Sequence, residues 1–282
     1  YIWILPSIIL MFIFIIIPIG FVFRMAFSQV TKAGLVKGFI GFKNFEKVLG
    51  GAKFGMVLKN TVVWTLYVVI LSTILGFILA LLLNNEFKGR KIARAIVVFP
   101  WATTLVIQAS IWNFIINKDY GTLNILLKTL GIIQANINWT PTPEAYFAWE
   151  IACGIFVTIP FVCFTALSGL QSIDSSYYEA ALVDGANYWQ QLFNITVPLV
   201  KPSLTVATVL NIIYVFNSFP IVWTITKGDP ANRTDTLVTY LYKLAFYNGK
   251  QGEAAAVSVI GFLILLVCAS VYMVSTLKKG DE

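Results

Sequence analysis

The sequence predicts an all-α membrane protein with about six transmembrane helices. Hydrophobic residues make up 58% of its 282 residues, only 12% are charged, and the mean hydropathy is +0.81. A soluble domain carries about 25% charged residues, so this chain cannot cover a water-facing surface. The apolar residues form long continuous runs instead of the ten-residue alternations of membrane barrels, which indicates helices.

Each predicted helix must cross a bilayer core of about 30 Å, which takes about 20 residues. Six runs are long enough: Ile2–Phe27, Thr61–Leu83, Ile92–Ile116, Ala145–Leu170, Ser203–Thr226 and Ala254–Leu277. Prolines within these runs each remove a backbone hydrogen bond, which membrane helices tolerate where neighbours satisfy the freed carbonyl. They are Pro6, Pro18, Pro100 and Pro160. We expect a kink in the fourth helix, because Pro160 lies in mid-span.

The composition excludes several chemistries. The chain has no His, so it has no imidazole base and no His-ligated metal. It has no Gly-rich phosphate loop and no nucleophile–base set. Glu150 is the one acid inside a predicted span, and we interpret it as an interfacial contact or a contact between helices. We expect Cys153, Cys163 and Cys268 to be buried free thiols. Any active transport must therefore draw its energy from a partner, and no enzymatic activity is expected.

The basic residues leave the orientation open. Lys88, Arg90, Lys91 and Arg94 follow the second run, and their density favours the cytoplasmic side, as do Lys278 and Lys279. An even number of spans then places seven of the 20 basic residues inside, these six and Lys201, and the other thirteen outside. The total count therefore opposes this orientation. A shortened N-terminal tail without its basic residues would explain part of the conflict.

The insert 171–201, between the fourth and fifth runs, has the pattern of two short capped helices. Ser176 and Glu179 form an S-x-x-E capping box, although Asp174 or Ser175 can cap instead. Asp184-Gly185 should end the first helix, because glycine readily adopts the positive-φ conformation of a helix end. Asn187 can cap the second helix, with Gln190 three residues later. We expect Pro198 and Pro202 to close the insert.

Two interpretations of the insert compete. It can lie on the lipid headgroups, since Trp189, Leu192, Phe193 and Thr196 fall near one helical face. Against this, Ala180 and Ala181 are small enough for another protein to approach the backbone. The acids Glu179 and Asp184 would also be repelled by anionic lipid. We therefore favour a protein-docking element.

These residues resemble a known signature. Permease subunits of binding-protein-dependent ABC importers carry Glu-Ala-Ala, three residues, Gly, nine residues and Ile-x-Leu-Pro in a cytoplasmic loop. Here Glu179-Ala180-Ala181, Gly185 and Ile195-Thr196-Val197-Pro198 fit that spacing, with Val197 in place of Leu. Asp174 stands where the family more often has Pro. Further stretches resemble the sugar-type permeases of the maltose and glycerol-phosphate uptake group: Phe39–Phe45, Phe99–Trp101, Asp119–Asn124, Gly169–Ile173, Phe216–Phe219 and Thr226–Pro230.

The resemblance, closest to the MalF-like member of the usual pair, implies a type I ABC importer fold. It implies one transmembrane permease domain over 1–282, with a five-helix core over 60–277 and a cytoplasmic coupling loop over 171–201. The implied partners are a second, MalG-like permease, two copies of a cytoplasmic ATPase that binds MgATP, an external solute-binding protein and membrane lipid, without nucleic acid. The chain itself needs no cofactor. Both termini would face the cytoplasm of a bacterial inner membrane.

In this scheme the insert transmits movement of the ATPase to the helices. The residues that the resemblance assigns to this coupling are Glu179, Ala180, Ala181, Asp184, Gly185, Ile195 and Pro198. The solute path would run between the two permeases near Pro160. Its candidate residues are Thr158, Phe161, Tyr214, Asn217 and Ser218. Gly154, Val157 and Val215 occupy family sugar-contacting positions without a polar side chain, so the contacts should differ from those of a maltose site.

The sequence is compatible with several functions. The leading one is a permease subunit of an ATP-driven carbohydrate importer, with an oligosaccharide as the expected solute. Polyol phosphates, amino acids, oligopeptides and other small solutes are alternatives within the same class. An autonomous channel or facilitator would make the insert a simple surface helix. A membrane anchor would have no solute path, and the path candidates would then only pack helices together.

Overall fold

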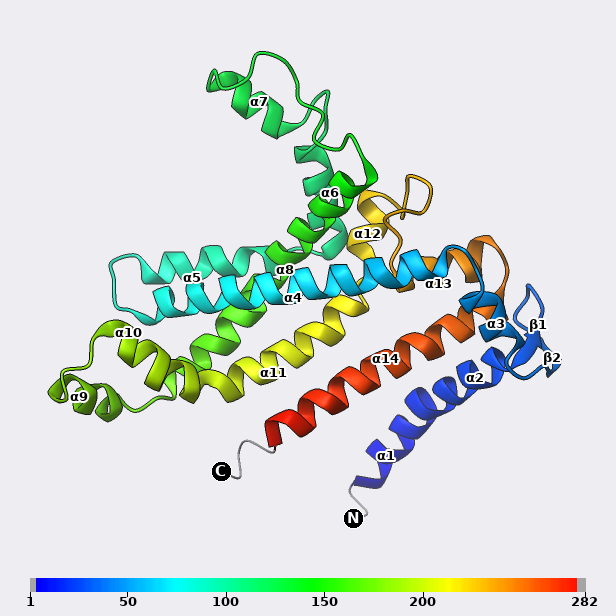
Figure 1. The fold of residues 1–282 in the computed structure, drawn as a ribbon, viewed down its shortest axis with the longest axis horizontal. Helices are drawn as coiled ribbons and strands as arrows, with labels where there is room; N and C mark the ends of the chain where they lie inside the picture. Colours follow the sequence, from blue (N-terminus) through cyan, green and yellow to red (C-terminus); the bar gives the residue numbers. More distant parts are fainter. Residues whose placement is uncertain (1–3, 278–282) are drawn as a thin grey trace. The chain divides into compact units, whose positions relative to one another are not determined.

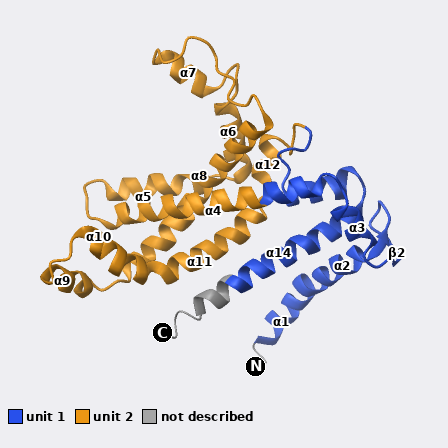
Figure 2. Cartoon of the chain, in the orientation of Figure 1, with its two compact units in different colours: residues 1–61, 231–282 blue, residues 62–230 orange. Residues whose placement is uncertain are grey.

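The computed structural model describes residues 4–277, with side chains over 4–271, and this part is mostly helical (Figure 1). It divides into two compact units, one formed by Tyr1–Thr61 with Ala231–Glu282 and the other by Val62–Pro230 (Figure 2). The long helix α4, Phe54–Asn84, begins in the first unit and continues in the second.

The first unit contains two predicted spans and a small antiparallel hairpin. Its elements are α1 (Leu5–Met11), η2 (Phe12–Ile16), α2 (Ile17–Ala26), β1 (Ser28–Val30), β2 (Val36–Phe39), α3 (Lys43–Leu49), α13 (Leu237–Tyr242), η5 (Lys243–Tyr247) and α14 (Gln251–Leu277). Helix α14 packs along α2 and against α3. The hairpin pairs Ser28 with Phe39 and Gln29 with Gly38.

The second unit contains the rest of α4 and the other spans. Its elements are α5 (Arg90–Val98), η3 (Phe99–Ala102), α6 (Leu105–Ile115), α7 (Thr122–Thr129), α8 (Pro143–Gln171), α9 (Ser175–Val183), α10 (Tyr188–Gln191), η4 (Leu192–Thr196), α11 (Val197–Phe216) and α12 (Pro220–Ile225). Helix α8 packs along α11, and α6 packs against α12.

Six spans are confirmed if the third, predicted as the single run Ile92–Ile116, is counted as a bent pair of helices. The axes of α5–η3 and α6 meet at 98°. Pro100 cannot donate a backbone hydrogen bond. Thr104 caps α6 by accepting from the backbone N–H of Ile107, and the buried Gln108 donates to the carbonyl of Pro100 and to the hydroxyl of Thr103. Side chains thus satisfy the backbone at the bend.

The expectation that Pro198 and Pro202 close the insert is wrong, because α10, η4 and α11 follow one another without a break from Tyr188 to Phe216. The π-helical turn η4 ends two residues before Pro198. A proline ring clashes with the carbonyl four residues earlier in an α-helix, and the wider π turn relieves that clash. The turn η2 precedes Pro18 in the same way. Helix α8 likewise continues as one element through Pro160.

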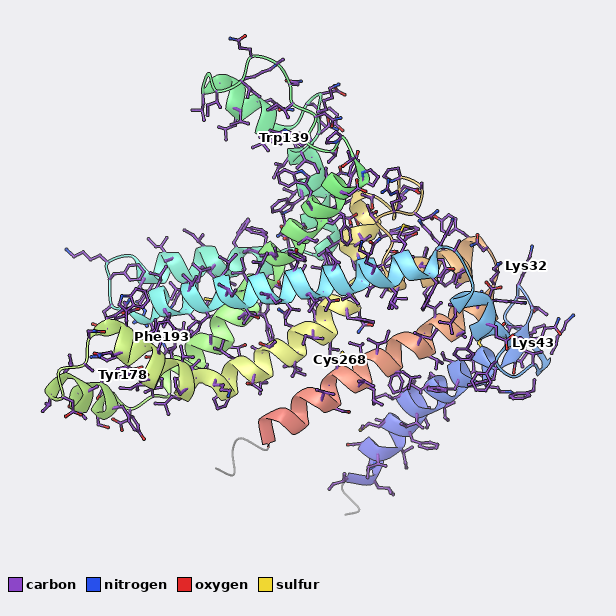
Figure 3. All side chains as sticks on the ribbon, in the orientation of Figure 1. Lys32, Lys43, Trp139, Tyr178, Phe193 and Cys268 are labelled. Carbon is purple, nitrogen blue, oxygen red and sulfur yellow. The ribbon has the colours of Figure 1, made fainter. Side chains whose placement is uncertain are left out.

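The buried residues of the spans mostly agree with the sequence prediction. Glu150 is fully buried and accepts a hydrogen bond of 2.6 Å from the Thr226 hydroxyl, which confirms the predicted inter-helix contact. Cys153 and Cys163 are buried as expected. Cys268, labelled on α14 in Figure 3, is exposed, contrary to prediction. A long apolar run predicts only that a residue lies in the membrane. Whether its side chain is buried within the protein depends on which helices pack against it.

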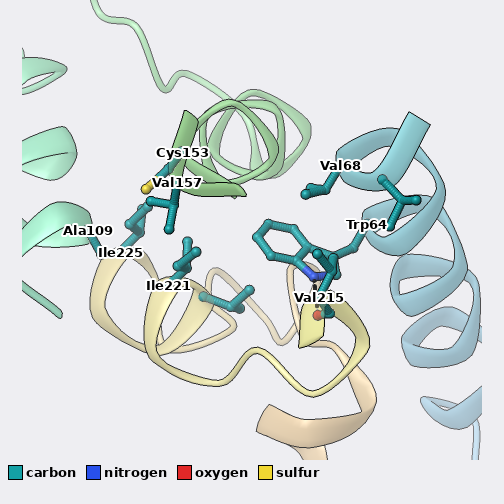
Figure 4. Packing of buried hydrophobic residues seen from close by; sticks show 10 residues of the cluster. Trp64, Val68, Ala109, Cys153, Val157, Val215, Ile221 and Ile225 are labelled. Atoms are coloured by element: carbon teal, nitrogen blue, oxygen red, sulfur yellow. Dashed lines mark hydrogen bonds between the residues drawn. The ribbon is translucent and has the colours of Figure 1, made fainter. Parts of the chain in front are cut away.

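Two hydrophobic clusters stabilise the second unit. One gathers Trp64, Val68, Val157, Val215 and Ile221 from α4, α8, α11 and α12 (Figure 4). Within it the Trp64 indole donates 2.9 Å to the carbonyl of Val215, one of the last carbonyls of α11. The other cluster joins Leu83, Leu170 and Val200, and so fixes the ends of α4 and α8 beside the start of α11.

Candidate functional site

The insert 171–201, which we call the coupling segment, begins with an N-cap on α9. The carboxylate of Asp174 accepts a hydrogen bond of 2.9 Å from the Ser176 backbone N–H. This hydrogen bond lowers the pKa of Asp174 below its ordinary value of 3.8. Of the three caps that the sequence left open, the structure therefore has Asp174. A carboxylate also suits the positive end of the helix dipole.

The turn after α9 is a Schellman motif built on Gly185. Its φ is +76°, the left-handed region that only glycine adopts without strain. The N–H of Ala186 donates 2.9 Å to the carbonyl of Ala181, and the N–H of Gly185 donates 3.1 Å to that of Leu182. The predicted helix end is confirmed. Nothing lies within 4 Å of an added Cβ at Gly185, so backbone conformation and not space selects glycine here.

Helix α10 begins shortly after that glycine with the predicted capping box. The Asn187 N–H donates 2.8 Å to the Gln190 side chain, and the Gln190 N–H donates 3.0 Å to the Asn187 side chain. The Tyr178 and Thr196 hydroxyls, 3.0 Å apart, join α9 to η4. The helix continues from η4 directly into α11. The contact between the two hydroxyls therefore connects α9 to a membrane span.

The signature residues differ in exposure. Most are exposed, namely Glu179, Ala180, Asp184, Gly185 and Pro198, whereas Ala181 is buried and Ile195 is half-buried. Neither acid pairs with a basic residue of the described chain. Leu182 and Val183, which are 64% and 89% exposed, add an apolar surface beside the acids. The exposed end of α9 can thus offer both charge and apolar area to another molecule.

The expected single face of Trp189, Leu192, Phe193 and Thr196 is wrong. Leu192 and Thr196 are buried, while the Trp189 and Phe193 rings are exposed and stack with centroids 6.2 Å apart. The π turn η4 adds a residue to the helical turn, which rotates the later positions relative to Trp189. Figure 3 labels Tyr178 and Phe193 in this segment.

A pocket of about 330 Å³ lies between η3, α8 and α11 of the second unit. Its lining brings together three of the predicted path residues, Thr158, Phe161 and Tyr214. Trp101, Leu210 and Asn211 complete the lining. The Trp101 and Phe161 rings stack with centroids 6.0 Å apart, and Trp101 is placed there by the bend between α5 and α6.

Asn211 is the polar residue of this pocket that sequence reasoning missed. It is 1% exposed, and its Nδ2 donates 2.9 Å to the Ser72 hydroxyl. Its Oδ1 has no hydrogen-bond partner among the described residues. An unpaired buried acceptor is costly, so this atom can take a donor from a bound solute. The signal in the sequence was the amide side chain of Asn211 itself, because polar groups are costly inside an apolar span.

The other two path candidates do not line the pocket. The Asn217 amide donates 2.8 Å to the carbonyl of Ile213 and so caps the C-terminal end of α11. Ser218 is buried in the break between α11 and α12, with a hydroxyl that has no hydrogen-bond partner among the described residues. Thr158 does line the pocket, but its hydroxyl donates to the carbonyl of Gly154 at 2.8 Å. No three His, Cys, Asp or Glu side chains of the described chain gather to hold a metal ion.

The bent multi-helix fold, with two capped helices between its fourth and fifth spans, is that of an importer permease. The chain belongs to the binding-protein-dependent transport system inner membrane component family, whose pattern matches residues 72–277. It is therefore a multi-pass subunit of a binding-protein-dependent transporter of the inner membrane.

Relatives and a solved structure agree with this family. The chain is 45% identical over 273 residues to a probable ABC transporter permease protein of Brucella suis biovar 1 (strain 1330), covering 97% of this chain and 94% of that protein. It is 36% identical to the trehalose/maltose transport system permease protein MalF of Thermococcus litoralis, covering 97% and 92%. A chain of a bacterial alginate ABC transporter, crystallised with an alginate pentasaccharide-bound periplasmic protein, matches with a TM-score of 0.83 and 25% identity, covering 96% and 91%.

Proposed function

We propose that this chain is the MalF-like permease subunit of an ATP-driven carbohydrate importer. It pairs with a second permease, receives its solute from an external binding protein and is driven by a cytoplasmic ATPase dimer. The family match carries this proposal, because members of the family depend on a binding protein. The relatives named for trehalose/maltose and for alginate support carbohydrate as the solute class.

The pocket supports the same solute class by its chemistry. A sugar presents hydroxyl donors and flat apolar C–H faces. The Asn211 Oδ1 can accept from such a hydroxyl, and the stacked Trp101 and Phe161 rings can pack against C–H groups. Tyr214 adds a phenol at the rim, where it is 49% exposed.

In the proposed mechanism the coupling segment faces the cytoplasm and docks into the ATPase. MgATP binds and is hydrolysed there, so this chain supplies no catalytic group. Closure of the ATPase dimer displaces α9, and the displacement passes through the Gly185 turn, α10 and the Tyr178–Thr196 contact into α11. Helix α11 carries Asn211 and Tyr214, so the movement reaches the pocket directly.

The complete complex in proteoliposomes tests the function. We expect uptake of a carbohydrate that requires the binding protein and ATP together. Deletion of 179–198 should release the ATPase from the two permeases during affinity purification. Uptake by this chain alone, without ATP, would make it a facilitator and overturn the proposal.

The pocket is tested by Asn211→Leu, which preserves side-chain volume and removes the acceptor. We expect the half-saturating concentration for uptake, measured with saturated binding protein, to rise about tenfold for the loss of a buried hydrogen bond. Ser72→Ala is the matched control, because it removes the partner of Asn211 Nδ2 and leaves Oδ1 in the pocket. An equal loss in both variants would assign Asn211 to helix packing.

A further inference from the structure

Six lysines cluster in the first unit with almost no acid near them in the sequence. They are Lys32, Lys37, Lys43, Lys47, Lys53 and Lys59, and the one acid between positions 28 and 60 is Glu46. The segment thus carries six positive charges and one negative charge, a net charge of +5. None of these lysines forms an ion pair with the described chain. Lys250, in contrast, is paired with Glu253 at 3.1 Å.

These lysines lie on an ordered element and not on a flexible tail. The buried Asn44 donates 2.9 Å hydrogen bonds to the carbonyls of Ala26 and Ser28, and so joins α3 to the end of α2 and to β1. The Phe27 ring contacts those of Phe39, Phe42 and Phe45 at centroid distances of 5.0 to 6.5 Å. The hairpin, α3 and the end of α2 therefore form one platform.

Several of the charges have fixed positions on this platform (Figure 3). Lys43 and Lys47 are four residues apart on α3 and share a helical face. Lys37 and Phe39 are two residues apart on β2 and share a strand face, where Phe39 is 79% exposed. The stem of Lys32 lies so close to Gly249 that a Cβ there would be 2.9 Å from its Cγ. An exposed aromatic ring thus lies among lysines that point outward.

The lysines and the coupling segment are separated in the sequence by three spans: α4, the bent pair of α5–η3 with α6, and α8. An odd number of crossings places the two on opposite sides of the membrane. The 31 residues of α4 span about 46 Å, enough to cross the bilayer. If the coupling segment is cytoplasmic, the lysines are external, where positive charge opposes the usual topological bias. A role outside the membrane would explain why they are kept there.

We propose that this platform is the docking face for an acidic surface of the solute-binding protein. The inference rests on the proposed function, which places the platform outside and requires such a partner. Unpaired lysines around an exposed Phe ring fit a partner with carboxylates around an apolar contact, and they attract it over about one Debye length. Anionic lipid is the less suitable partner, because lipid-binding clusters lie in a run beside a span, whereas these lysines are spread over a hairpin, α3 and α4.

The test measures binding of the purified cognate solute-binding protein to the whole complex in phosphatidylcholine nanodiscs. The variant is Lys43→Gln with Lys47→Gln. Its control is Lys118→Gln with Lys128→Gln, two exposed lysines, one in the turn before α7 and one in α7. We expect the Kd of the α3 variant to rise about fivefold at about 50 mM NaCl and less than twofold at about 500 mM. The control should bind as the unaltered complex does, and Lys43→Arg with Lys47→Arg should restore binding.

Two results would overturn the docking inference. One is an unchanged Kd or a loss that does not depend on salt. The other is unchanged docking together with weaker association of the α3 variant with phosphatidylglycerol vesicles, which would assign the lysines to lipid. Failure of the proposed function looks different, because then the unaltered complex itself would neither bind the solute-binding protein nor hydrolyse ATP faster in its presence.

Discussion

Two short helices of this chain end in the same way. Helices α7 and α9 both stop at a glycine with positive φ, +70° at Gly131 and +76° at Gly185. In both, the glycine N–H and the next N–H return to carbonyls of the last turn, from Ile132 to Leu127 and from Ala186 to Ala181. Neither glycine has an atom within 4 Å of an added Cβ. The local motif is therefore the same at two places.

The two turns lead into different structures. After Gly185, α10 begins within three residues and leads through η4 into α11. After Gly131, a loop returns to Asn124, whose side chain donates to the carbonyls of Lys118 and Ile137 and accepts from Trp139. The Gly185 turn thus leads directly into a span. The Gly131 turn leads into a loop that is held by hydrogen bonds to Asn124. We therefore expect the connection, and not the motif, to decide which turn affects transport.

The largest expected effect separates the two glycines. Gly185→Val and Gly131→Val each force a β-branched residue into the left-handed region, at a similar local cost of about 1–2 kcal/mol. We expect ATP-driven uptake in proteoliposomes to fall at least tenfold for Gly185→Val and less than twofold for Gly131→Val. The reason is that only the Gly185 turn lies between the proposed ATPase contact and α11.

Both variants must assemble for that comparison to hold, which co-purification with the second permease checks. Equal losses of uptake would show that any strained turn disables the protein. Full uptake by an assembled Gly185→Val complex would remove the turn from the coupling mechanism.

Sequence alone anticipated the coupling segment well, because its signals are local. Gly185, Asn187 and Gln190 cap helices through residues only a few positions away. The 98° bend after Pro100 was missed, since the groups that satisfy it, Thr104 and Gln108, read as ordinary members of an apolar run.

A smaller effect is expected at the contact between α9 and η4. Tyr178→Phe removes the hydroxyl that lies 3.0 Å from the Thr196 hydroxyl while keeping the ring. Loss of one such hydrogen bond costs about 1 kcal/mol. We expect uptake to fall about threefold while ATP hydrolysis continues, because displacement of α9 would move α11 less. Tyr177→Phe, on the exposed neighbour, is the control, and an equal fall there would refute this role for the contact.

The pocket shows the other limit of sequence reasoning. The family resemblance placed Thr158, Phe161 and Tyr214 on the expected solute path, and the structure brings them together. Sequence reasoning could not place Trp101, because its position depends on the bend. It also could not distinguish Asn217, which caps α11, from a residue that faces the pocket. Those distinctions depend on tertiary contacts.

The smallest effect is expected at the N-cap of α9. The pKa of Asp174 is lowered by the Ser176 N–H, so its contribution is present above the unfolded pKa near 3.8 and is lost as pH falls through the lower folded value. Hydrogen exchange of α9 should therefore show no pH-dependent loss of protection between about pH 5 and 8 beyond the intrinsic rate, and a loss below about pH 4. Asp174→Asn keeps an acceptor and should abolish that loss. If the loss persisted in Asp174→Asn, another group would be responsible.

Site-specific photocrosslinking can show whether α9, and not α7, contacts the ATPase. A benzoylphenylalanine would replace Val183, which is 89% exposed at the end of α9, or Leu130, which is 62% exposed at the end of α7. Irradiation of the assembled complex should crosslink the ATPase subunit to position 183 and not to position 130. A crosslink at 130 alone, or none at 183 in an intact complex, would contradict the account.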